Sequence, residues 1–123
     1  MMLYIAIAIG GALGAVSRYA MTQLFPLVGE GFPKAVFLAN LLGCFLAGVL
    51  YVVIVERASL PTYWREPLIV GFCGALTTYS SFALDALALW QSGQAQTAII
   101  YVVLTTVFCI VAAFAAVTLT RML

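Results

Sequence analysis

The sequence contains no histidine, few charged residues and only three cysteines, and each scarcity excludes a class of function. Without histidine there is no histidine-based metal site or catalytic triad. A net charge of +1 is too small to hold the phosphate backbone of a nucleic acid. Cys44, Cys73 and Cys109 each lie inside an apolar run, without metal-ligand spacing or a disulfide framework. We interpret them as small buried hydrophobic residues.

Hydrophobic residues, by contrast, make up 66% of the 123 residues, and charged residues only 7%. Soluble domains contain roughly 45–50% apolar and about 25% charged residues. A soluble domain of this size could not bury so much apolar surface, and disordered chains have the opposite composition. The composition therefore predicts an all-α integral membrane protein.

Four apolar segments are each long enough to cross a bilayer as a helix. They cover approximately residues 3–24, 35–55, 68–90 and 98–120, and segments of about 21–23 residues span a hydrocarbon core of ~30 Å. The connections are short and contain helix-stopping residues. These are Pro26, Gly29, Pro33, Pro61 and Gly93. We predict one four-helix membrane domain over residues 1–123, whose first segment is retained as a helix and not cleaved as a signal peptide.

Basic residues are divided almost evenly between the two ends of the predicted bundle. Arg57, Arg65 and Arg121 fall at the end that holds the N-terminus, whereas Arg18 and Lys34 fall at or near the other end. Such residues normally set the orientation in the membrane. The weak bias leaves two alternatives: one slightly favoured orientation, or insertion both ways, with two copies forming an antiparallel dimer.

Two charged residues, Arg18 and Asp85, and one asparagine, Asn40, lie inside the predicted spans, where a charge costs a few kcal/mol. Arg18 and Asp85 are expected at similar depth and could pair. Alternatively, Arg18 reaches the membrane interface and Asp85 makes a local hydrogen bond. Asn40 either makes an interhelical hydrogen bond or points its amide into a pathway.

The centre of the third span has the most unusual sequence, GFCGALTTYSSF over residues 71–82. Glycine weakens a helix, and Ser and Thr can bond to freed backbone groups. Irregular backbone at this depth is tolerated only where it is buried in protein or lines a cavity. A break here would leave carbonyl oxygens able to hold a cation. The alternative is a straight helix whose hydroxyls bond to preceding carbonyls.

Aromatic and polar side chains near this motif allow two interpretations each. The ring edges of Tyr79 and Phe82 could contact an anion along a narrow path, or the rings could simply pack. Four residues recur at four-residue steps on the fourth span and form one stripe: Thr97, Tyr101, Thr105 and Cys109. That stripe could follow a desolvated ion, or its hydroxyls could bond to their own helix.

Three motifs occur in order along the first three spans. Residues 10–19 read GGALGAVSRY, residues 40–48 read NLLGCFLAG, and residues 71–82 complete the series. They resemble the signatures GGxxGAxxRY, NxxGxFxxG and GxxGxxTTFSTF of the Fluc (CrcB) fluoride channels. Their order and spacing agree across essentially the whole chain.

The resemblance implies a dual-topology, antiparallel homodimer in the cell inner membrane, with two passive pathways for fluoride export. It also implies a structural Na⁺ at the dimer centre, held by the backbone carbonyls of Gly74 and Thr77, where the third helix is broken near the midplane. Arg18 matches the first-helix arginine near the vestibule. The fluoride pathway would be lined by Asn40, Tyr79, Ser80, Ser81, Phe82, Tyr101, Thr105 and Cys109.

This chain departs from the family pattern at the pathway positions Tyr79 and Cys109. The family usually has Phe at the first, and a phenol keeps the ring edge but adds a hydroxyl. A thiol is a weaker donor than a hydroxyl, which weakens the inner end of the polar track. Ser81 stands where the family has Thr and keeps the hydroxyl.

Other functions explain fewer of these features. No nucleophile or general base is evident, so we do not expect an enzyme. A small multidrug-type proton antiporter typically needs a carboxylate in its first span, and residues 1–24 contain none. A non-transporting assembly subunit would leave the hydroxyl motifs unexplained. We expect the partners to be fluoride, membrane lipid and a second copy of the chain, and no nucleic acid.

Overall fold

The computed structural model describes residues 1–27, 31–58 and 60–123, and over these residues all regular structure is helical. Four segments are long and apolar enough to cross a membrane: Met2–Leu24, Lys34–Arg57, Thr62–Gln91 and Ala95–Met122. Each contains one of the four predicted segments, which confirms four helices of membrane-spanning length, and each is longer than predicted. The predicted helix-stopping residue Gly29 lies outside the described residues.

The second and third segments are each built from several elements. The first segment is α1 (Met2–Leu24) and the fourth is α6 (Ala95–Met122). The second joins α2 (Lys34–Leu50) to the π-helical η1 (Tyr51–Arg57). The third contains α3 (Thr62–Glu66), π-helical η2 (Pro67–Cys73), α4 (Gly74–Leu76) and α5 (Tyr79–Gln91).

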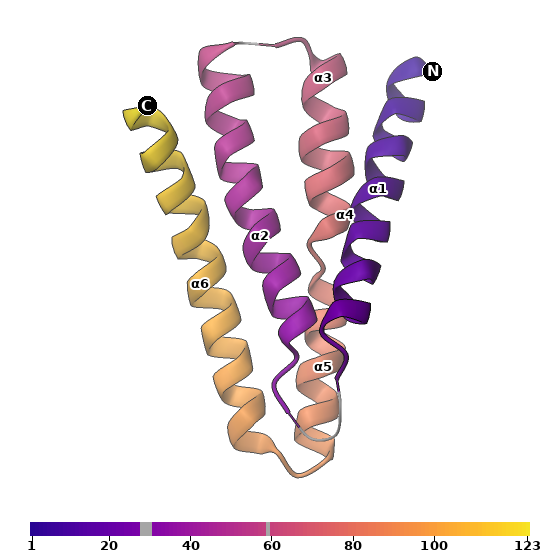
Figure 1. Ribbon diagram of the computed structural model, residues 1–123, viewed down its shortest axis with the longest axis vertical. Coiled ribbons are helices and arrows are strands. Elements are labelled where there is room, and N and C mark those ends of the chain that lie inside the picture. The colour runs from indigo at the N-terminus through magenta and orange to yellow at the C-terminus, as the bar shows by residue number, and fades with distance from the viewer. Residues whose placement is uncertain (28–30, 59) are drawn as a thin grey trace.

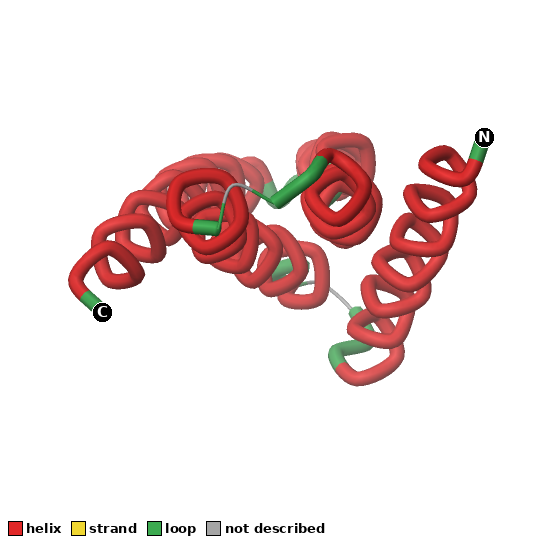
Figure 2. The backbone as a smooth tube through the Cα atoms, turned by 90° about the horizontal axis from the view of Figure 1, so that it is seen from above, coloured by secondary structure: helices red, strands yellow, loops and turns green. Residues whose placement is uncertain are grey.

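The four segments run up and down, with both termini at the same end of the bundle (Figure 1). The turn between α5 and α6 lies at the opposite end. Gly93, at φ 81°, makes this turn, and that backbone conformation favours glycine. Seen from above, α1 and α6 lie on opposite sides of the bundle (Figure 2). Helix α1 packs on η2 and α4, and α6 packs on α2 and α5.

Glycines allow α1 to approach the third segment closely. Gly10 and Gly14 are both buried. A Cβ added at Gly14 would lie 3.0 Å from the Leu76 nitrogen, and one at Gly71 would lie 2.7 Å from the Ile7 carbonyl oxygen. Small residues of this kind let membrane helices pack backbone against backbone. The Gly10-x-x-x-Gly14 pattern therefore serves packing within the chain.

Arginines tie η1 to the C-terminal end of α6. Arg57 Nη2 donates to the Thr120 carbonyl at 2.6 Å, and Arg121 Nε donates to Glu56 Oε2 at 3.0 Å. The carbonyls at the end of a helix lack partners within the helix, so Arg57 satisfies one of them. These contacts join η1 to α6 at the end of the bundle where both termini lie (Figure 1).

Candidate functional site

The helical hydrogen bonding of the third segment changes between α4 and α5. Helix α4 ends at Leu76 and α5 begins at Tyr79. Between them, Thr77 (φ −76°, ψ 152°) and Thr78 (φ −150°, ψ 122°) have extended backbone. Thr78 then caps α5, because its Oγ1 accepts a hydrogen bond from the Ser81 backbone nitrogen at 3.2 Å. We call these two threonines the α4–α5 junction.

Asn40 on α2 holds the α4–α5 junction with both ends of its side-chain amide. Its Nδ2 donates to the Thr78 carbonyl at 3.1 Å, and the Thr78 backbone nitrogen donates to its Oδ1 at 2.6 Å. The Asn40 side chain thus pairs with both the N–H and the C=O of Thr78, in the way that a neighbouring β-strand pairs with a backbone. Of the two alternatives for Asn40, the interhelical hydrogen bond is therefore formed. Its Nδ2 carries a second hydrogen that this pair does not use.

The same hydrogen bonds release two carbonyl oxygens, those of Gly74 and Thr77. In a continuous α-helix, the Thr78 N–H would donate to the Gly74 carbonyl and the Ser81 N–H to the Thr77 carbonyl. Here the first donates to Asn40 and the second to the Thr78 hydroxyl. Both carbonyls therefore lose the helix donor that they would otherwise accept from.

A cavity of about 300 Å³ lies beside the junction, between α2, α5 and α6. Most of its wall consists of apolar groups and hydroxyls or thiols. Six of the residues predicted for the site line it: Asn40, Thr77, Tyr79, Phe82, Thr105 and Cys109. The fold therefore brings together, from three segments, side chains that are up to 69 positions apart in the sequence, from Asn40 to Cys109.

Thr105 is the one hydroxyl in this wall that is both buried and free. Its side chain is 4% exposed, and Oγ1 has no hydrogen-bond partner among the residues that the structure describes. The alternative in which this hydroxyl bonds to its own helix is therefore wrong, although Thr106 on the same helix does so, donating to the Val102 carbonyl. An unsatisfied buried hydroxyl costs about 1–3 kcal/mol. A ligand that accepts a hydrogen bond in the cavity would recover this free energy.

Other predicted residues lie next to the cavity. Tyr101 is fully buried, with its ring centroid 5.3 Å from that of Phe82. Ser81 hydroxyl accepts from the Thr78 hydroxyl at 3.2 Å. Ser80 is exposed, with its oxygen 3.2 Å from the same threonine oxygen. These side chains touch residues of the wall.

Arg18 and Asp85 do not pair, so that alternative is wrong. Arg18 donates to the Ala75 carbonyl at 3.1 Å and to Ser81 Oγ at 3.4 Å. Asp85 instead accepts from the Tyr101 hydroxyl at 3.2 Å. The physical reason is rotational: α1 packs on η2 and α4, whereas α5 turns Asp85 toward α6. Arg18 and Asp85 were expected at similar depth in the membrane, but similar depth did not make them partners.

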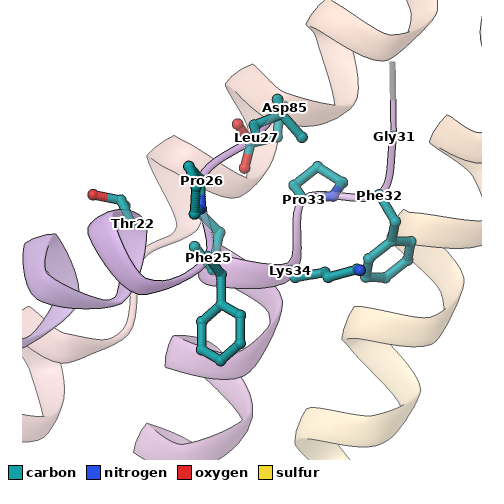
Figure 3. A pocket seen from close by; sticks show the side chains of 11 residues that line it. Thr22, Phe25, Pro26, Leu27, Gly31, Phe32, Pro33, Lys34 and Asp85 are labelled. Atoms are coloured by element: carbon teal, nitrogen blue, oxygen red, sulfur yellow. The ribbon is translucent and has the colours of Figure 1, made fainter. Parts of the chain in front are cut away.

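Sequence reasoning missed a second, larger cavity of about 520 Å³ near the α1–α2 connection. Among the residues that border it are Thr22 at the end of α1, Lys34 at the start of α2, and Asp85 on α5 (Figure 3). Because Asp85 bonds to Tyr101, and Tyr101 packs on Phe82, these three side chains connect the two cavities. The only feature of the sequence that pointed to this cavity was the carboxylate of Asp85 within an apolar span.

Comparison with known proteins gives a consistent result. Residues 5–117 match the family described as CrcB-like protein, Camphor Resistance (CrcB). The Fluoride-specific ion channel FluC of Saccharophagus degradans is 47% identical over 123 residues, covering 100% of this chain and 92% of the relative. The FluC proteins of Hahella chejuensis and Stutzerimonas stutzeri are 41% and 42% identical, and each alignment covers 95% of this chain. The alignments cover 93% of the Hahella chejuensis protein and 95% of the Stutzerimonas stutzeri protein.

Proposed function

The chain belongs to the CrcB-like protein family, and on this premise we propose that it is a fluoride-selective, passive channel that exports fluoride across the cell membrane. It is a multi-pass membrane protein. The observation that carries the proposal is the unpartnered, buried Thr105 hydroxyl in the cavity beside the α4–α5 junction. That hydroxyl is a donor held ready for a small acceptor, and the relatives named above are fluoride channels.

The mechanism follows from the cost of removing water from a small anion. Fluoride must exchange its hydration shell for donors and positive ring edges that the pathway supplies. The Thr105 hydroxyl, the second Nδ2 hydrogen of Asn40 and the edge of the Phe82 ring provide these groups in one wall. Among the described residues that line this cavity there is no Lys or Arg. Binding is therefore weak enough for release, and the electrochemical gradient drives the flow.

The larger cavity provides the entrance to this pathway. Lys34 attracts an anion to it, and its wall reaches Asp85, which bonds to Tyr101. Tyr101 in turn packs on Phe82 at the smaller cavity. Arg18 lies to one side, bonded to Ser81. In this arrangement Tyr101, Ser81 and Cys109 extend the polar track, and Ser80 and Tyr79 border the junction.

Two copies in antiparallel orientation form the working unit. The proposal is supported by exposure at the junction: Gly74 and Ser80 are exposed, and Tyr79 is 82% exposed in the single chain. Polar groups facing hydrocarbon are costly, and a second copy would cover them. The near-even division of basic residues permits the opposite insertion of the two copies.

A structural Na⁺ between the two copies fits the backbone at the junction. The carbonyls of Gly74 and Thr77 have lost their helix donors, and Gly74 is exposed on the surface that a second copy would cover. Oxygen atoms of this kind are the ligands that hard cations take. The carbonyls of Gly74 and Thr77 from each copy would hold the ion, which would supply a fixed positive charge between them. Asn40 and the Thr78 hydroxyl hold the backbone open for it.

Removing sodium is expected to weaken the dimer. Purification in a large organic cation in place of Na⁺ leaves the junction carbonyls facing each other without a counter-charge, so they repel. The dimer fraction, measured by cross-linking in detergent, should fall several-fold and return when Na⁺ is restored. An unchanged dimer fraction after thorough exchange would argue against the sodium site.

Liposomes that contain the protein should release fluoride and retain chloride. The selectivity arises because chloride is larger and gains less from closely placed donors. Thr105→Val removes a donor to a charged ligand, worth about 1.5–3 kcal/mol, and should slow fluoride efflux by roughly 10-fold or more. Phe82→Ile should also slow it, because the ring edge is lost. Ion-selective electrodes measure both fluxes.

The matched control is Phe114→Ile, on the same helix as Thr105 but 73% exposed on the outer surface. This variant should conduct fluoride at the rate of the unmodified chain. Chloride efflux comparable to fluoride efflux would overturn the channel assignment. Unmodified rates in Thr105→Val and Phe82→Ile would remove those residues from the pathway.

A further inference from the structure

Thr77, the first residue of the α4–α5 junction, uses both of its donors on one carbonyl. Its backbone nitrogen and its hydroxyl each donate to the Cys73 carbonyl, and both distances are 3.0 Å. A β-branched side chain has few rotamers, and the hydroxyl bond to the carbonyl four positions earlier selects one of them. The Thr77 carbonyl, by contrast, has lost its helix donor, because the Ser81 nitrogen donates to the Thr78 hydroxyl.

The other branch of the Thr77 side chain, its methyl group, lies against Gly43 of α2. Gly43 is buried. A Cβ added at Gly43 would overlap Thr77 Cγ2, yet it would lie 3.6 Å from both the Cβ and the backbone nitrogen of Thr77, which is ordinary contact. The methyl group alone therefore fills the space that a side chain at Gly43 would need. The two branches of one Cβ are thus held from two sides, by Cys73 and by Gly43.

Helix α2 holds both residues of the junction from one face. Asn40 pairs with the backbone of Thr78, and Gly43 receives the methyl group of Thr77. Asn40 and Gly43 are three positions apart, which places them on the same face of a helix. The junction has extended backbone without helical hydrogen bonds to fix its direction. Contacts from α2 supply that direction.

We propose that Gly43 is a positioning residue that, through the methyl group of Thr77, sets the direction of the Thr77 carbonyl. This inference rests on the proposed function, in which that carbonyl helps to hold Na⁺ between two copies of the chain. The Thr77 side chain cannot turn without losing its bond to Cys73 or entering α2. Hard cations need several oxygen atoms at once, so a carbonyl that turns away weakens binding.

The test moves one methyl group from Thr77 to Gly43. Gly43→Ala adds a methyl group where Thr77 Cγ2 lies, and Thr77→Ser removes Cγ2 but keeps the hydroxyl. In the double variant the methyl group is on α2, and its contacts with Thr77 Cβ and nitrogen are ordinary, at 3.6 Å. The measurement is the Na⁺ concentration at which half of the dimer returns, by cross-linking of purified full-length protein in a large organic cation. We call this concentration the Na⁺ midpoint.

Gly43→Ala should raise the Na⁺ midpoint by about 10-fold or more, because overpacking at this contact displaces the Thr77 backbone. Thr77→Ser should raise it by about threefold or more, because serine keeps the hydroxyl but has more rotamer freedom. The double variant should have a lower midpoint than Gly43→Ala, within about threefold of the unmodified chain, since the effects of residues in contact do not add. The melting temperature of each variant is measured at saturating Na⁺.

Two matched controls make the same chemical changes away from this contact. Thr120 on α6 is also buried, and its hydroxyl donates to the Ala116 carbonyl four positions earlier. Thr120→Ser removes the same methyl group at the end of the bundle where both termini lie (Figure 1). Gly11→Ala adds a methyl group whose nearest contact would be 3.9 Å away, at the Gly71 carbonyl oxygen. Both should keep the unmodified Na⁺ midpoint.

The proposal is overturned if Thr77→Ser keeps the unmodified Na⁺ midpoint, a result that is measurable even where Gly43→Ala does not fold. It is also overturned if the double variant regains the melting temperature but not the midpoint, since Gly43 would then serve packing alone. A unmodified dimer that needs no Na⁺ would reject the sodium site and the positioning role together. Shifted midpoints in a protein that does not select fluoride over chloride in liposomes would support the positioning role and reject the channel.

Discussion

Replacing Asn40 with alanine is expected to destabilise the α4–α5 junction and to slow fluoride efflux by at least tenfold. The change removes Asn40 Oδ1, which accepts from the Thr78 nitrogen at 2.6 Å. It also removes Asn40 Nδ2, which donates to the Thr78 carbonyl at 3.1 Å. Each buried backbone group left unpaired costs about 1–3 kcal/mol, so the loss for the two is about 2–6 kcal/mol. A cost of this size is a large part of the stability of a small membrane domain.

The measurements are thermal unfolding in detergent, followed by tryptophan fluorescence, and fluoride efflux from liposomes. Asn40→Asp keeps an acceptor for the Thr78 nitrogen but loses the donors to the Thr78 carbonyl and to the anion. It also places a carboxylate inside the membrane beside the Thr78 carbonyl oxygen, which costs a few kcal/mol. It should therefore be destabilised and should also conduct poorly.

Gln91→Ala is the control for loss of an amide side chain, because Gln91 is exposed at the end of α5. It should resemble the unmodified chain in both measurements. If Asn40→Ala had an unchanged melting temperature and flux, then its hydrogen bonds to Thr78 would not hold the junction.

Two neighbouring glycines on α1 are expected to respond to alanine in opposite directions. A Cβ at Gly10 would overlap the Pro67 carbonyl oxygen and lie 3.1 Å from the carbonyl carbon. At Gly11 the nearest atom would be the Gly71 carbonyl oxygen, at 3.9 Å, which is ordinary contact. Gly10→Ala should therefore push α1 away from η2. The free energy of unfolding should fall by about 1–3 kcal/mol or more, as it usually does when a core is overpacked.

Gly11→Ala should instead be neutral or stabilising, by up to about 1 kcal/mol, because alanine favours helix more than glycine does. The measurements are the yield of folded protein and the melting temperature, compared between Gly10→Ala and Gly11→Ala. The variants differ by one position and carry the same added methyl group, so composition cannot explain a difference. Equal melting temperatures would show that α1 does not pack on the third segment through Gly10.

The membrane spans were predictable from the sequence because apolar length is a local property. The bilayer requires about 20 apolar residues for each crossing, and the sequence supplies four such runs. Their ends were less predictable: the third helical segment begins at Thr62, six positions before the expected residue 68. Hydropathy marks where the hydrocarbon begins, whereas the helix continues through the polar residues that follow Pro61.

The chemistry of the candidate site was also largely present in the sequence. The residue types at positions such as Asn40, Phe82 and Thr105 indicated polar groups in a membrane, and each must find a partner or a ligand. The motifs that carry the family resemblance are contiguous, so no folding was needed to read them. The match to the CrcB-like family confirms the resemblance over residues 5–117.

The partner of each polar group was decided only by the tertiary structure. Asn40 bonds to Thr78, 38 positions away, and Asp85 bonds to Tyr101 and not to Arg18. The larger cavity, which side chains from α1, α2 and α5 border, arises in the same way. The sequence determined the four spans and the residue types within them, because these depend on neighbouring residues alone. Contacts between helices depend on how each helix is rotated about its own axis. A shift of one position along a helix turns a side chain by about 100°, so the tertiary structure decides which side chains meet.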